Sequence, residues 1–165
     1  MIGVIGAGAF GTALAITLGR DGREVRLWAR DANHIAAMAA SRRNEARLPG
    51  ILFPESVSVT AQIGDLTGAE ALILSVPMQA LGAFLALHHV RIDGIPLVAC
   101  CKGIDLSSLK GACALMSEAC PTSTVAVLTG PSFAADIAKG LPTALTLAST
   151  EGETLQRLTG LAPLQ

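Results

Sequence analysis

The chain has 165 residues, of which 51% are hydrophobic and 15% are charged, and its formal net charge is −1. That length suits one domain with a hydrophobic core, and the near-neutral charge gives no basis for nucleic-acid binding or attraction to an anionic membrane. No apolar run reaches the roughly 18 residues that a membrane-spanning helix needs, so integral membrane association is also excluded at this stage.

Apolar runs alternate with helical patterns along most of the chain. The expected strands cover residues 2–5, 24–28, 57–60, 71–76, 97–100, 124–128 and 143–148. The expected helices cover residues 10–20, 32–41, 78–89, 106–119, 133–139 and 151–158. This alternation is typical of an α/β fold with a doubly wound, mostly parallel sheet that is buried on both faces. The stretch RRNEARLPGILFPES, residues 42–56, contains two prolines and a glycine and predicts a surface loop.

The cysteines show no spacing that indicates a metal site or a redox pair. They are Cys100, Cys101, Cys113 and Cys120. We therefore expect reduced, buried thiols, no bound metal and a cytoplasmic protein. The opening residues MIGVIG lack a basic leader and contain glycines, so we expect no signal peptide.

The strongest motif is the glycine-rich turn between the first strand and the first helix. Gly6, Gly8 and Gly11 form the pattern G-x-G-x-x-G. Gly6 permits a tight turn, Gly8 lets the backbone approach a pyrophosphate, and Gly11 lets the helix pack close to the strand. The helix N-terminus adds free N–H groups and a partial positive charge. The motif predicts a dinucleotide-binding, Rossmann-like domain; the alternative is a glycine turn that serves packing alone.

The second strand ends in VRLWARD, residues 25–31, without the acid that would bind an adenosine ribose. Ala29 removes a carboxylate that would repel a 2′-phosphate, and Arg30 can donate two hydrogen bonds to that phosphate. Asp31 is placed to cap the next helix, and Trp28 is expected to be packed. NADP(H) is therefore the preferred cofactor, with NAD(H) as an alternative; an exposed surface charge is the other interpretation of Arg30.

Further candidate residues follow three later strands, and thus lie at the carboxyl edge of the sheet, where ligands bind in open α/β folds. Pro77 either guides the chain past a nicotinamide or simply begins a helix. Lys102 is a lone cation that could orient a carbonyl or meet a phosphate, or it is an ordinary exposed lysine. Gly130 and Ser132 begin a helix and suit an oxyanion or a polyol, or they form a capped turn.

Together these segments resemble the bacterial NAD(P)-dependent sn-glycerol-3-phosphate dehydrogenases. The matching stretches are GAGAFGTALA at 6–15, VRLWARD at 25–31, RRNEARLPGILFP at 42–54, SVP at 75–77, CKGID at 101–105, TGPSFA at 129–134 and GLPTALTLAS at 140–149. The resemblance implies reversible hydride transfer from NAD(P)H to dihydroxyacetone phosphate, which gives sn-glycerol 3-phosphate, a precursor of phospholipids.

The resemblance also assigns roles by position. The residues implied to contact the cofactor are Ala9, Phe10, Arg30, Lys102 and Ala134. The residues implied to contact the substrate are Lys102, Gly130 and Ser132. Many family members have a polar residue where this chain has Ala9, so a contact there would use the backbone.

One departure from the family is large. The family has a second, helical domain that supplies the main acid–base lysine and a segment that binds the substrate phosphate, and neither has a counterpart in residues 1–165. We expect the chain to be the amino-terminal cofactor domain of a two-domain enzyme, inactive alone and with apolar surface compatible with a homo-oligomer. The alternatives are a stand-alone NADP(H)-binding module without turnover, and a related oxidoreductase that acts on another small acid or sugar phosphate.

Overall fold

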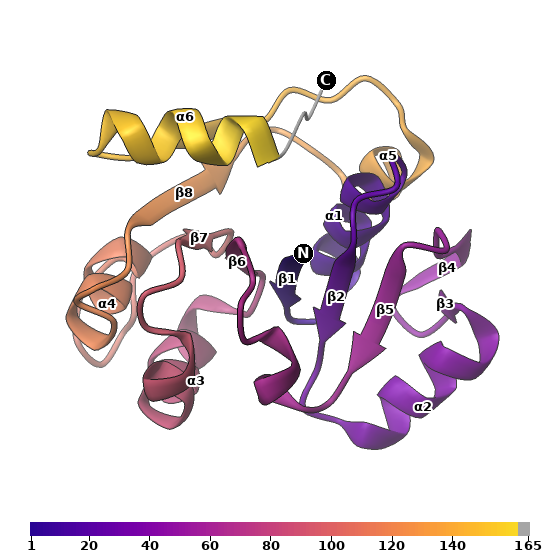
Figure 1. Cartoon of the computed structure of the whole chain (residues 1–165), viewed down its shortest axis with the longest axis horizontal. Coiled ribbons are helices and arrows are strands. Elements are labelled where there is room, and N and C mark those ends of the chain that lie inside the picture. Colours follow the sequence, from indigo (N-terminus) through magenta and orange to yellow (C-terminus); the bar gives the residue numbers. More distant parts are fainter. Residues whose placement is uncertain (162–165) are drawn as a thin grey trace.

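The fold is built on a seven-stranded sheet, seen in a computed structural model that describes residues 1–161 (Figure 1). Its strands, in chain order, are β1 (Ile2–Ile5), β2 (Val25–Trp28), β5 (Val57–Thr60), β6 (Ala71–Leu74), β7 (Leu97–Ala99), β8 (Val125–Thr129) and β9 (Thr146–Ala148). The spatial order is β5-β2-β1-β6-β7-β8-β9, and the pairs are parallel except β8 with β9. The expected doubly wound, mostly parallel sheet is confirmed.

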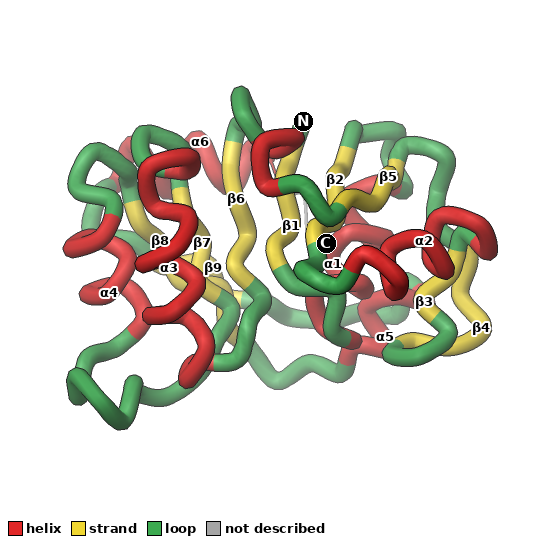
Figure 2. The backbone as a smooth tube through the Cα atoms, turned by 90° about the horizontal axis from the view of Figure 1, so that it is seen from below, coloured by secondary structure: helices red, strands yellow, loops and turns green. Residues whose placement is uncertain are grey.

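Helices cover both faces of this sheet, as Figure 2 shows from below. One face packs against α1 (Ala9–Gly19), α2 (Ala32–Ser41), α5 (Ala134–Lys139) and α6 (Gly152–Leu161). The other packs against α3 (Met78–Ile92), α4 (Ala112–Ala119) and the 3-10 helix η1 (Ile63–Leu66). Because successive strand residues point to opposite faces, Val4 lies in the first core and Ile5 in the second. Both are fully buried, which is why β1 is apolar throughout.

The prediction of a surface loop at residues 42–56 is wrong. Instead, β3 (Arg43–Asn44) and β4 (Leu48–Leu52) pair as an antiparallel ribbon. Apolar side chains explain the difference, since Leu48 and Phe53 are 5% and 3% exposed and join the core beside α1 and α2. The ribbon therefore lies at the surface but is anchored to the core by these side chains.

The helix expected at residues 106–119 begins only at Ala112. The Asp105 carboxylate accepts hydrogen bonds from the Ser107 hydroxyl and from both the hydroxyl and the N–H of Ser108. Leu109 has a positive φ of 58°, which no α-helix contains. Local side-chain bonding of this kind competes with helix formation, so the segment is a loop.

The other expected elements are present. The strands at 2–5 and 57–60 and the helix at 32–41 have the expected bounds, and the rest differ by a few residues at an end. The strand expected at 143–148 is confined to 146–148. None of the helices in residues 1–161 has the length and apolar character needed to cross a membrane.

Candidate functional site

The candidate site lies at the carboxyl edge of the sheet, where the loops after β1, β2, β6, β7 and β8 meet. Ile5, the last residue of β1, is in register with the last residues of β2 and β6, Trp28 and Leu74. The chain builds β2 and β5 on one side of β1 and then crosses to build β6, β7 and β8 on the other. Ligands in open α/β sheets bind at such a switch point.

Two glycines of the motif are required by packing. Gly6 has a φ of +107°, and a Cβ there would come within 2.6 Å of the Ser75 carbonyl oxygen. A Cβ on Gly11 would collide with the Gly6 carbonyl oxygen. The expected roles of Gly6 in the tight turn and of Gly11 in close helix packing are confirmed.

Gly8 differs from both, because a Cβ built on it meets no heavy atom within 4 Å. It is the N-cap residue of α1, and no side chain caps this helix. The first bond of the helix runs from the Thr12 N–H to the Gly8 carbonyl at 3.0 Å, which leaves the N–H groups of Ala9, Phe10 and Gly11 without helical partners. Open space beside uncapped N–H groups fits an anionic group such as a pyrophosphate.

The loop after β2 carries an exposed arginine, Arg30, and an acid, Asp31, that is hydrogen-bonded to the start of α2. Arg30 is exposed and forms none of the ion pairs found within residues 1–161. The Asp31 carboxylate accepts from the N–H groups of Asn33, at 2.9 Å, and His34, at 3.2 Å. The expected N-cap role of Asp31 is thereby confirmed, and the adjoining Ala29 is half-buried.

Trp28 is packed, as expected. It is 7% exposed, lies edge-on to Phe84 with ring centroids 5.6 Å apart, and donates its indole N–H to the Ala61 carbonyl at 3.1 Å. Pro77 is the N-cap residue of α3. The helix-start explanation of Pro77 therefore accounts for its position.

Lys102 follows β7 in a loop that is tied to the start of α3. It is exposed and takes part in none of the ion pairs within residues 1–161. Gln79 donates to the Ile104 carbonyl at 2.8 Å and accepts from the Leu106 N–H at 3.0 Å. Gln79 thus anchors the loop that carries Lys102, a role that the sequence analysis missed.

The turn after β8 needs its glycine for steric reasons. Gly130 has a φ of +154°, and a Cβ there would come within 2.6 Å of the Ala144 carbonyl oxygen. Ser132 and Ala134 are half-buried at the start of α5, while the intervening Phe133 is 77% exposed. The structure therefore brings Lys102, Gly130 and Ser132 to the edge that the glycine loop occupies.

A second missed residue is Asn44, which is fully buried although its segment was expected to be a loop. Its side-chain amide donates to the Ala7 carbonyl at 3.0 Å, inside the glycine motif. An isolated asparagine in a polar stretch carries no periodic signal, so only the fold brings it to the site.

The cysteines lie in environments that suppress their reactivity. All four are free; Cys100 and Cys120 are buried, while Cys101 and Cys113 are half-buried. Burial raises the pKa of Cys100 to about 12, and the neighbouring Cys101 adds to the effect. Burial also raises the pKa of Cys101. Within residues 1–161, no three of the His, Cys, Asp and Glu residues group as metal ligands.

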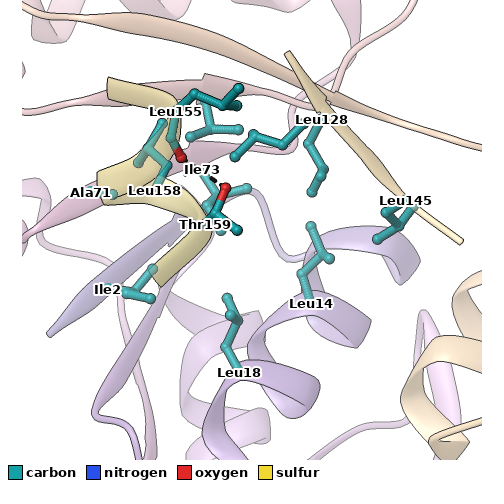
Figure 3. Close-up of a pocket in the computed structure, with 12 residues that line it drawn as sticks. Ile2, Leu14, Leu18, Ala71, Ile73, Leu128, Leu145, Leu155, Leu158 and Thr159 are labelled. Carbon is teal, nitrogen blue, oxygen red and sulfur yellow. Dashed lines mark hydrogen bonds between the residues drawn. The ribbon is translucent and has the colours of Figure 1, made fainter. Parts of the chain in front are cut away.

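A cavity of about 250 Å³ lies away from this edge, between α1, α6 and the sheet (Figure 3). Figure 3 shows Leu155 and Leu158 of α6 facing the same space as Leu14 and Leu18 of α1. The residues that line the cavity include Ile2 and Ala71, the first residues of β1 and β6. Its lining lacks charged side chains and does not suit a dinucleotide.

The chain has extensive similarity to known proteins. Residues 1–155 match the family described as NAD-dependent glycerol-3-phosphate dehydrogenase N-terminus. The chain is 51% identical over 157 residues to a glycerol-3-phosphate dehydrogenase (NAD(P)+) from Roseobacter denitrificans, covering 95% of this chain and 49% of that protein. A protein of the same name from Cereibacter sphaeroides is 51% identical over 168 residues, covering all of this chain and 50% of the relative.

Solved structures agree with this relationship. Glycerol-3-phosphate dehydrogenase from Coxiella burnetii superposes with a TM-score of 0.91 and 31% identity, over 97% of this chain and 50% of that one. The Plasmodium falciparum enzyme shares the fold, with a TM-score of 0.86 and 21% identity, over 97% of this chain and 48% of that one. The chain thus spans about half the length of the relatives it matches. It belongs to the NAD-dependent glycerol-3-phosphate dehydrogenase family, of which it matches the amino-terminal part.

Proposed function

We propose that this chain is the NADP(H)-binding portion of an enzyme that interconverts dihydroxyacetone phosphate and sn-glycerol 3-phosphate. The observation that carries the proposal is the geometry of the glycine motif. Gly6 and Gly11 are glycines because neighbouring atoms leave no room for a Cβ, whereas Gly8 faces open space at the uncapped start of α1. Family membership supports the same role, since the matching model is that of an NAD-dependent enzyme.

The proposed cofactor contacts follow from the positions of the loops. Backbone N–H groups at the start of α1 would hold the pyrophosphate, and Arg30 would pair with a 2′-phosphate. Because Asp31 is bonded to the N-terminus of α2, the arginine next to it is the charged group available to a ligand, which favours NADP(H) over NAD(H). When bound, the cofactor supplies the hydride. The full proposed set is Gly6, Gly8, Ala9, Phe10, Gly11, Arg30, Lys102 and Ala134.

The substrate contacts proposed on this chain are Lys102, Gly130 and Ser132. Lys102 would orient and polarise the substrate carbonyl, since it is an exposed cation at the carboxyl edge. The relatives are about twice as long as this chain, so we assign the main acid–base group to the part of those proteins that it does not match. Four free thiols fit a reducing compartment, which supports a cytoplasmic location.

A stand-alone NADP(H)-binding module is the second candidate, because the chain matches only half of each relative. Both candidates bind cofactor, and they differ in turnover and in whether the coding sequence continues past Gln165. A gene that continues into a helical domain supports the enzyme. A stop codon after Gln165 supports the module.

Cofactor binding itself is tested by titrating the chain with NADPH. Trp28 is the single tryptophan and ends β2 beside the candidate site, so NADPH binding should quench its emission. We expect saturable quenching by NADPH and weaker quenching by NADH. Gly8→Val is the matched variant, because its added side chain would fill the proposed pyrophosphate position. Equal quenching of the variant and the wild type would overturn the proposal.

A further inference from the structure

The two completely buried polar side chains of the core are bonded to each other at the glycine motif. Asn44 and Thr12 are both 0% exposed. The Asn44 side-chain amide donates to the Thr12 hydroxyl oxygen at 2.7 Å and to the Ala7 carbonyl oxygen at 3.0 Å. Ala7 lies between the first two glycines of the motif, and Thr12 lies in the first helical turn after it. One buried side chain thus joins the ribbon β3–β4 to both parts of the motif.

The orientation of the Asn44 amide follows from its partners. A backbone carbonyl can only accept, so the NH₂ group must face Ala7, and the Asn44 carbonyl oxygen must face the other way. That oxygen lies 2.9 Å from Nε2 of His34, which must therefore carry a proton and donate. His34 belongs to the first turn of α2, whose N-cap is Asp31, the residue after Arg30. Asn44 consequently connects the motif to the helix that follows Arg30.

The bond to Ala7 also sets the direction of the next N–H. The Ala7 carbonyl and the Gly8 N–H belong to the same peptide unit, and in a planar trans peptide they point in opposite directions. Asn44 draws the carbonyl toward the core, so the Gly8 N–H points away from it. None of the backbone hydrogen bonds found within residues 1–161 uses the Gly8 N–H. The peptide is thus held with its donor available at the residue whose side-chain position is open.

We propose that Asn44 is a positioning residue for dinucleotide binding: by holding the Ala7 carbonyl, it fixes the Gly8 N–H toward the pyrophosphate. The inference rests on the proposed NADP(H) site and goes beyond it, since Asn44 itself does not touch the ligand. Free rotation of the Ala7–Gly8 peptide would remove one donor from the anion and add the cost of ordering the loop. Full burial of the Asn44 side-chain amide strengthens this role, because in an exposed position water would compete with it for the Ala7 carbonyl.

The test compares Asn44→Leu with Thr12→Val as a matched control. Asn44→Leu keeps the branched shape of the side chain but removes the donor to Ala7, whereas Thr12→Val removes a buried bond of the same cluster and leaves that donor in place. Both should lower the melting temperature. We expect Asn44→Leu to weaken NADPH binding roughly tenfold or more, and Thr12→Val to leave it unchanged. Asn44→Ala, which is smaller, serves if the leucine variant does not fold.

A second ligand separates positioning from a general loss of structure. Adenosine 2′-monophosphate lacks the pyrophosphate, so its binding should survive in Asn44→Leu while NADPH binding falls. Equal NADPH affinity in folded Asn44→Leu and wild type, or an equal loss for both ligands, would overturn the role of Asn44 and leave the proposed function standing. A wild-type chain that binds neither NADPH nor NADH would overturn both.

Discussion

The Asp31 carboxylate accepts a hydrogen bond from the Asn33 N–H at 2.9 Å, which fastens the acid at the end of β2 to the first turn of α2. An acid at this end of a dinucleotide-binding domain ordinarily binds the adenosine ribose and favours NAD. Here the acid is bonded within the protein, and the exposed side chain beside it is Arg30. This arrangement supports the proposed preference for a cofactor with a 2′-phosphate, because it leaves Arg30 as the exposed charged group beside an acid that is already bonded.

Arg30→Ala should reduce the preference for NADPH over NADH. Losing one charge-assisted contact to the 2′-phosphate costs about 1.5–3 kcal/mol, so the ratio of the two dissociation constants should fall roughly tenfold or more. Titration with each cofactor, followed by Trp28 fluorescence, gives the two dissociation constants. Arg157→Ala on α6 is the control, because Arg157 is also an exposed arginine. An unchanged ratio in Arg30→Ala would assign the phosphate to another group.

Gly8→Val and Gly6→Ala should separate binding from folding. A Cβ at Gly8 meets no heavy atom within 4 Å, so Gly8→Val should fold but bind NADPH roughly tenfold less tightly or worse, a loss of at least about 1.4 kcal/mol. Gly6→Ala should lose about 1–3 kcal/mol of folding stability through backbone strain alone, because its φ is +107°. Denaturant unfolding measures the folding stability of both variants, and titration with NADPH measures their affinity. Gly8→Val with normal affinity would show that Gly8 does not face the ligand.

The periodic parts of the fold could be predicted from the sequence, since they depend on local residue order. The apolar run of β1 and the alternating valines of β5 predicted the right bounds, and the spacing of Gly6, Gly8 and Gly11 located the strand-to-helix turn. These signals arise within one element, where strand or helix periodicity and backbone sterics act on neighbouring residues. The position of the candidate site at the carboxyl edge of the sheet could be predicted from these elements, because parallel strands bring their carboxyl ends to the same edge.

Contacts between distant segments could not be predicted in the same way. The prolines and glycine of residues 42–56 suggested a loop, yet burial of Leu48 and Phe53 outweighs that local preference. Asn44 bonds to a carbonyl 37 residues away, and nothing in its neighbours indicates that partner. One local contact was missed as well: the Asp105 carboxylate shortens the helix expected at residues 106–119, and its bonds to two serines depend on rotamers rather than on periodicity.

Raising the pH should destabilise the fold through Cys100. Its thiol has an ordinary pKa of 9.0 when unfolded and about 12 when buried in the fold, because burial disfavours the thiolate. Below pH 9 both states keep the proton, so the stability is fully present. Between pH 9 and 12 the unfolded chain releases the proton first, and the free energy of unfolding should fall by about 1.4 kcal/mol per pH unit.

Cys100→Ala isolates this effect from the titration of lysines at the same pH. The variant should lose about 1–2 kcal/mol near pH 7 through packing, and its stability should decline less steeply above pH 9 than that of the wild type. Urea unfolding across the pH range measures both slopes. Parallel slopes for variant and wild type would mean that the Cys100 thiol is not buried as the structure has it.

Residues 1–165 alone should not catalyse hydride transfer. Hydride transfer needs the cofactor, the substrate and a proton donor held together in a site that excludes water. Residues 1–165 are proposed to supply the cofactor site, Lys102 and the turn from Gly130 to Ser132, but not the main acid–base group. The purified chain should therefore bind NADPH without oxidising it when dihydroxyacetone phosphate is added.

Lys102→Met makes the assignment of roles testable in a complete enzyme of this sequence. If Lys102 orients and polarises the carbonyl, the kcat/KM of the variant should fall by roughly 100-fold or more, well beyond its loss of NADPH affinity, as for other lost electrostatic contacts to a reacting oxygen. Lys110→Met, later in the same loop, is the control, because Lys110 pairs with Glu118 on α4 at 2.7 Å. NADPH oxidation by the pure 165-residue chain, lost in Lys102→Met, would instead place the proton donor within these residues and make Lys102 that donor.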